Sequence, residues 1–156
     1  MAGHTNHEFY FDGLSPIDER GGAGPREGSM LATMINEHFG SFLAMKRIFI
    51  DETRDIKGEG WGWLAFNKNE SMIEYHHSVN ETRLEGKHLH AILGIDAHYH
   101  AYKFDYEQNK EQYLTQIFKI INWDVVETRL DEALEHHKQE QEERLKKLEK
   151  SIKDDL

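Results

Sequence analysis

Apolar residues in the first third of the chain recur every three or four positions, as they do along one face of a helix. They are Met30, Leu31, Met34, Ile35 and Phe39, and a second apolar set occupies residues 42–48. Ser29 is placed to cap the first helix, Gly40 to end it, and Ser41 to begin the next one. The pattern predicts an α-helical hairpin or one bent helix, followed by a charged linker over residues 51–59.

Short strand-like segments follow the predicted helices. Residues 61–66 (WGWLAF) are rich in aromatic side chains, residues 67–70 are typical of a turn, and residues 72–77 can return as an antiparallel strand. After a polar loop over residues 79–90, the apolar run 91–95 predicts a third strand. The middle of the chain is therefore expected to form a small antiparallel sheet.

Helical spacing returns after the strands. Tyr113–Ile121 has the pattern of an amphipathic helix, and a further helical pattern begins at Asp124. Because the strands lie between two helical regions in the sequence, we expect an α+β fold.

The C-terminal residues differ in character from those before them. Residues 135–144 carry no apolar side chain, and apolar residues then resume at spacings of three and four, at Leu145, Leu148 and Ile152. We expect residues 135–156 to form a charged extension, either a solvated helix or a disordered arm, and the apolar residues of its last stretch to dock on a partner helix.

Glycine and proline mark the other boundary of the main domain. Residues 12–28 hold five of the twelve glycines and both prolines, which predicts a loop. The predicted organisation is an N-terminal segment with its loop over residues 1–28, an α+β domain over residues 29–134, and the extension over residues 135–156.

Composition narrows the classes of function. The chain has 156 residues, no cysteine and a formal net charge of −10. The lack of cysteine excludes disulfides, thiolate zinc sites and iron–sulfur clusters, and the acidic charge disfavours a broad phosphate-binding face. No run of roughly 18–20 apolar residues is present, and the first residues resemble neither a secretory signal nor a transit segment. We therefore expect a soluble protein without a membrane span.

A carboxylate and an imidazole stand close together after the third predicted strand. Asp96 and His100 are four residues apart, where the chain is expected to turn from a strand into a helix. Oxygen and nitrogen donors of this kind suit a metal ion, although the spacing itself is common.

Several motifs in these same segments resemble the iron/manganese superoxide dismutase family. Three of them stand in the family's order, at residues 58–64 (GEGWGWL), 93–102 (LGIDAHYHAY) and 122–126 (NWDVV). Upstream, residues 3–16 resemble the family's second-helix ligand segment, and residues 39–42 (FGSF) resemble its next helical junction. The resemblance implies the fold of that family's C-terminal domain, with helices, a three-stranded antiparallel sheet and helices, preceded by a truncated first helical hairpin of which residues 1–28 are the remnant.

The resemblance also implies a metal site. Members of the family bind one Mn or Fe through three histidines and one aspartate, and convert superoxide to oxygen and hydrogen peroxide. His7 matches the second ligand, Asp96 the aspartate and His100 the last histidine. The family's first helix, with the first histidine ligand and the tyrosine of the substrate gateway, has no counterpart in this sequence.

Residues around the implied site depart from the family's pattern. His98 and Tyr99 stand where the family has tryptophan and a glutamate that reaches across the dimer interface. The family's second-shell glutamine comes from one of two places, and these positions hold Gly3 and Glu81. An ionised glutamate does not donate the hydrogen bond that glutamine gives to metal-bound solvent.

These departures lead to three hypotheses. The first is a catalytically inactive structural subunit of a larger mitochondrial assembly, for which the small ribosomal subunit is the best candidate. Its partners would be protein subunits of that assembly or a homologous superoxide-dismutase-like chain, and any contact with ribosomal RNA would be indirect. The second is an active Fe/Mn superoxide dismutase whose first ligand-bearing helix is missing from this sequence. The third is a structural zinc held by His7, Asp96 and His100, either without His98, which then replaces a packed aromatic side chain, or with His98 as a fourth ligand.

Overall fold

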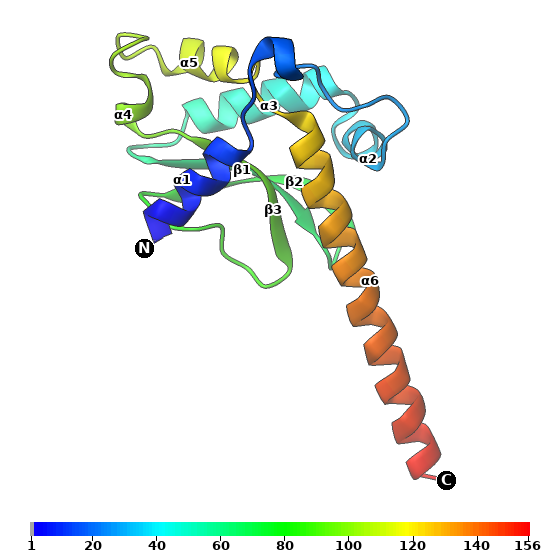
Figure 1. Ribbon diagram of the computed structural model, residues 1–156. Helices are drawn as coiled ribbons and strands as arrows, with labels where there is room; N and C mark the ends of the chain where they lie inside the picture. The colour runs from blue at the N-terminus through cyan, green and yellow to red at the C-terminus, as the bar shows by residue number, and fades with distance from the viewer. Residues whose placement is uncertain (1) are drawn as a thin grey trace.

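The computed structural model describes residues 2–156, and it is an α+β structure built on one three-stranded antiparallel sheet (Figure 1). Met1, the first residue of the predicted segment 1–28, lies outside the described residues. The sheet stands between helices that precede it and helices that follow it in the chain. The predicted fold class is therefore confirmed.

The sheet has the order β2-β1-β3. Its strands are β1 (Gly60–Asn67), β2 (Met72–Val79) and β3 (Leu89–Asp96). The central strand β1 is buried along its whole length, because it is paired on both edges and covered on both faces. Each predicted strand is present and is longer by two or three residues.

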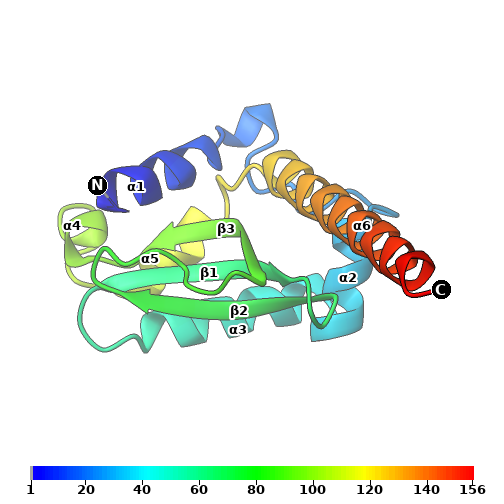
Figure 2. The same ribbon diagram turned by 90° about the horizontal axis from the view of Figure 1, so that it is seen from below.

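Helices cover the two faces of the sheet. Helices α2 (Met30–Phe39) and α3 (Phe42–Arg54) pack against β1 and β2, while α1 (Ala2–Asp12) and the first turns of α6 (Trp123–Asp154) pack against β3 from the other side (Figure 2). The side chains of Ser29 and Ser41 cap α2 and α3 by accepting hydrogen bonds from backbone N–H groups three residues on, as predicted.

The predicted linker over residues 51–59 was wrong in its first part, because α3 continues to Arg54. Two contacts hold this last turn. Arg54 Nη1 donates to Asp51 Oδ1 at 3.0 Å, and buried Thr53 shares a hydrogen bond of 3.0 Å with the hydroxyl of Tyr75 on β2. Polar residues therefore remain helical here because their side chains find hydrogen-bond partners in the folded protein.

The predicted helix over Tyr113–Ile121 is displaced toward the N-terminus. Helix α5 spans Lys110–Ile117, with Asn109 as its side-chain cap. Ile121 lies beyond it and forms an isolated antiparallel bridge with Leu14. The loop after α1, which contains the short 3₁₀ helix Ile17–Glu19, is thereby tied to the start of α6.

Helix α6 is one uninterrupted helix, so the predicted boundary between residues 134 and 135 lies inside it. What changes there is burial. Its first part carries the buried side chains of Val126, Leu130 and Ala133, and all residues from 138 onward are exposed. The last turns project away from the rest of the molecule (Figure 1). Within residues 2–156, no helix combines the length and the apolar character needed to cross a membrane.

Candidate metal centre

Three of the sequence-predicted site residues meet at the end of β3. His7 comes from α1, Asp96 ends β3, and His100 lies in the single-turn helix α4 (Tyr99–Tyr102). One nitrogen from each histidine and one carboxylate oxygen lie within 4.8 Å of one another. Residues 89 positions apart in the sequence are brought together because α1 packs along β3.

Asp96 is the centre of this cluster and is almost completely buried, with 2% of its surface exposed. Its Oδ2 accepts hydrogen bonds from Nε2 of His7 at 2.9 Å and from Nε2 of His100 at 2.8 Å. Its Oδ1 faces His98, whose backbone N–H donates at 2.9 Å and whose Nδ1 lies at 2.7 Å. One oxygen is thus held by His98, and the other is directed at the two candidate ligand nitrogens.

His7 is oriented by its other ring nitrogen. Its Nδ1 lies 2.8 Å from the carbonyl oxygen of Gly3, one helical turn earlier. Partial burial disfavours the charged ring, but the hydrogen bonds to Gly3 and Asp96, together with the negative charges of Asp96 and Glu81, raise the pKa of His7 above its usual value. Because a backbone carbonyl accepts from Nδ1–H, Nε2 on the Asp96 side is the nitrogen that can bind a metal once it loses its proton.

Aromatic rings form the wall beside the cluster. The ring of Trp61 meets His7 edge to face at a centroid distance of 4.9 Å, and it stacks on Trp63. The buried ring of His98 lies parallel to His100 at 5.1 Å and also contacts Trp61. His98 therefore fills part of the wall with an imidazole. The His100 side chain is half-exposed, which leaves the cluster open toward solvent on that side.

Gly3 and Glu81, the two positions at which the family places its glutamine, are adjacent in space. A Cβ atom on Gly3 would lie 2.8 Å from Oε2 of Glu81, so the Glu81 carboxylate already occupies that room. Oε1 of Glu81 lies 3.3 Å from Nε2 of His98, while Oε2 is buried without a hydrogen-bond partner. A carboxylate therefore stands beside the site where the family has an amide.

Two tyrosines near the site were not among the predicted site residues. The hydroxyl of Tyr113 donates to the backbone carbonyl of Asp96 at 2.7 Å. The hydroxyl of Tyr10 lies 3.0 Å from the Tyr113 hydroxyl. Burial raises the pKa of Tyr10 to about 12. The periodicity of α5 marks Tyr113 as a core position, but it carries no signal that its hydroxyl supports the ligand-bearing turn.

The donor set indicates which ions fit. Two imidazole nitrogens and one carboxylate oxygen suit Mn or Fe, which accept nitrogen and hard oxygen ligands. His98 does not add a fourth ligand atom to the group within 4.8 Å, since its two ring nitrogens face Asp96 and Glu81. A tetrahedral zinc site that uses His98 would require this ring to leave both partners.

Comparison with known proteins agrees with this arrangement. Residues 27–129 match the family model described as iron/manganese superoxide dismutases, C-terminal domain. The iron superoxide dismutase of Tetrahymena pyriformis is 36% identical over 135 residues, which cover 86% of this chain and 69% of that protein. The mitochondrial manganese superoxide dismutase of Oryza sativa subsp. japonica is 37% identical over 124 residues, which cover 78% of this chain and 53% of that protein.

A bacterial relative shows the same degree of similarity. The manganese superoxide dismutase of Chlamydia muridarum is 37% identical over 134 residues, which cover 84% of this chain and 63% of that protein. The chain thus spans between about half and about two thirds of the length of these relatives. By its family match, its motifs and its fold, the chain belongs to the iron/manganese superoxide dismutase family.

Proposed function

We propose that this chain acts in superoxide dismutation, with Mn or Fe held by His7, Asp96 and His100 and by a further ligand from outside the described residues. The observation that carries the proposal is the convergence of these three ligand atoms within 4.8 Å. The names of the related enzymes support the same hypothesis, since they include both iron and manganese superoxide dismutases.

The side chains around the ion have separable tasks in this proposal. Bound Mn or Fe would supply the one-electron chemistry that converts superoxide to oxygen and hydrogen peroxide. Asp96 would offset part of the positive charge of the ion, while its other oxygen is held in place by His98. The Gly3 carbonyl sets the tautomer of His7, and the half-exposed side of His100 gives a small anion access.

Metal binding can be tested without relying on activity. We expect purified full-length chain loaded with Mn or Fe to retain the metal through gel filtration and to melt at a higher temperature than after chelation. His7→Ala should abolish both effects. His4→Ala is the matched control, because His4 lies on the same helix, is largely exposed and pairs with Glu8.

The activity assay then separates the outcomes. Superoxide consumption that requires the metal and is lost in His7→Ala would support the dismutase proposal. Metal retained without any superoxide consumption would overturn it and favour a structural site. Identical melting curves with and without chelator, for the wild-type chain and for His7→Ala, would overturn the metal site itself.

A second candidate is a structural subunit of a larger mitochondrial assembly, for which the small ribosomal subunit is our specific hypothesis. The departures at His98, Tyr99 and Glu81 and the exposed end of α6 favour it. Two relatives named as mitochondrial enzymes motivate the compartment. Gradient sedimentation of the endogenous protein tests it: comigration with a megadalton particle, lost on deletion of residues 143–156, would support this candidate, and a peak only at dimer or tetramer size would exclude it.

A further inference from the structure

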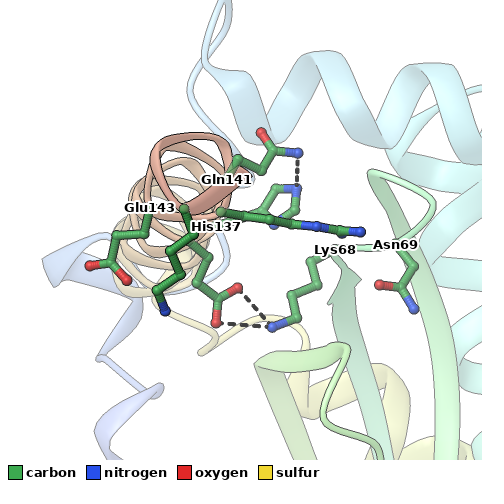
Figure 3. Close-up of a pocket in the computed structure, with 8 residues that line it drawn as sticks. Lys68, Asn69, His137, Gln141 and Glu143 are labelled. Carbon is green, nitrogen blue, oxygen red and sulfur yellow. Dashed lines mark hydrogen bonds and ion pairs between the residues drawn. The ribbon is translucent and has the colours of Figure 1, made fainter. Parts of the chain in front are cut away.

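The last turns of α6 carry a row of exposed apolar side chains. Leu145, Leu148 and Ile152 are each 57% exposed, and Leu156 is fully exposed. The root of this segment is fixed, because Lys68 Nζ on the β1–β2 turn donates to both carboxylate oxygens of Glu140 at 2.8 and 3.1 Å (Figure 3). Within residues 2–156, no hydrogen bond or ion pair joins the helix beyond Glu140 to another element.

The spacing of these side chains defines a narrow seam. Steps of three and then four residues assign Leu145 and Ile152 to heptad position a and Leu148 to position d. Isolated helices of this length are marginal in water, and pairs such as Glu142 with Lys146 add only a few tenths of a kcal/mol. These pairs support the helix but leave its apolar seam uncovered.

The composition of the extension excludes two kinds of occupant. Residues 135–156 contain seven acidic and six basic side chains, so they present no basic surface for nucleic acid. They also contain no aromatic residue, and their apolar side chains form one row instead of the broad face of a membrane-binding helix. A single row of apolar side chains at heptad spacing is the surface that a second helix covers in a coiled coil.

The charges beside the seam are complementary to those of an identical helix. With Leu145 at position a, Arg144 is at position g and Glu149 is at position e. In a parallel pair, a g residue faces the e residue five positions later on the other helix. Arg144 would therefore meet Glu149 of the partner subunit, and by symmetry this ion pair would form twice. An antiparallel pair centred on Leu148 would instead bring the two Glu149 side chains together.

We propose that residues 141–156 form a parallel two-stranded coiled coil with a second copy of this chain. Leu145, Leu148 and Ile152 fill its core, and Arg144 and Glu149 set its direction and its choice of partner. The proposal does not rest on superoxide dismutation or on metal binding. It assigns the extension to self-association through a surface separate from the candidate metal centre.

A charge swap in the full-length chain tests the choice of partner. In sedimentation experiments over a range of concentrations, we expect Arg144→Glu and Glu149→Arg each to weaken dimer formation about tenfold, and the double variant to restore it. Lys150→Glu, at the outward position f, is the matched control and should leave association unchanged. Failure of the double variant to restore association would overturn the proposal, because only an identical partner receives both changes.

Two further variants test the core and the direction of the coil. Leu148→Arg should remove the association without changing the melting temperature of the dilute monomer, since residue 148 is outside the folded body. If Leu148→Arg and the wild-type chain sediment alike at every concentration, the seam is not an interface between copies. Ile152→Cys supplies the only cysteine, so mild oxidation should cross-link a parallel dimer, whereas in an antiparallel pair centred on Leu148 the two residues at position 152 would lie on opposite sides of the centre and no cross-link would form.

Discussion

The two ends of α6 have similar apolar spacing and opposite environments. Near its start, Leu130 is completely buried against the sheet and neighbouring helices, whereas Leu148 near its end is 57% exposed. Each lies on an apolar stripe of the same continuous helix. The comparison shows that periodicity determines which face of a helix is apolar, while the elements packed opposite determine whether that face contributes to the stability of the fold.

The largest difference in stability is expected between two variants that each truncate one leucine, one in each half of α6. Leu130→Ala is expected to lower the free energy of unfolding by about 2–5 kcal/mol, because it leaves a cavity in the core. Leu148→Ala should change the stability of the monomer by less than about 0.5 kcal/mol. Urea titrations at low protein concentration check both values. Equal losses would show that the end of α6 packs on the body in solution.

A smaller effect is expected from a buried hydroxyl in the body. Tyr113→Phe removes the donor to the Asp96 carbonyl and leaves Tyr10 without its partner, so we expect a loss of about 1–3 kcal/mol. Tyr99→Phe, on the exposed turn beside the site, is the control and should be nearly neutral. Thermal unfolding of the two variants measures the difference. An unchanged melting temperature for Tyr113→Phe would mean that water replaces the hydroxyl.

An ion-pair cluster at the start of α6 should make the stability of the protein depend on pH. Arg26 and Arg20 both bond the Asp124 carboxylate, and they lower its pKa from 3.8 to about 2. Because the folded pKa is depressed, this stabilisation is present above pH ~4 and is lost as the pH falls toward ~2. Asp124→Asn should therefore melt about 2–4 °C below wild type at neutral pH and coincide with it near pH ~2. A gap that persists at pH ~2 would assign the effect to packing.

The smallest expected effect concerns the direction of the extension. Lys68→Met removes the ion pair with Glu140, and its effect on stability should not exceed about 1 kcal/mol. It should nevertheless broaden the distribution of distances between spin labels at Glu70 and Lys150, which the lack of native cysteine makes simple to attach. Lys57→Met is the control. A distribution unchanged by Lys68→Met would show that helix α6 is stiff without this contact.

Much of this fold could be predicted from the sequence because its signals are local. Ser29 and Ser41 cap the helices that they were expected to begin, and the three strand-like segments form the three strands. The end of α3 could not be predicted, since it depends on the bond between Thr53 and Tyr75, two residues that are distant in sequence.

The candidate site shows the same division. His7, Asp96 and His100 followed from motifs, and the structure brings them together. The contacts that orient them did not follow, because a backbone carbonyl such as that of Gly3 and a hydroxyl such as that of Tyr113 leave no trace in residue spacing. The domain boundary near residue 134 and the role of the three residues as ligands stay predictions.

The contact between Gly3 and Glu81 has a consequence for how this protein can change during evolution. One pocket of space serves both positions, since even a methyl group on Gly3 would meet the Glu81 carboxylate at 2.8 Å. Substitutions at the two positions are therefore expected to be epistatic. A larger residue at position 3 requires either that the end of the Glu81 side chain moves away from this space or that position 81 becomes smaller, so the two positions are expected to change together.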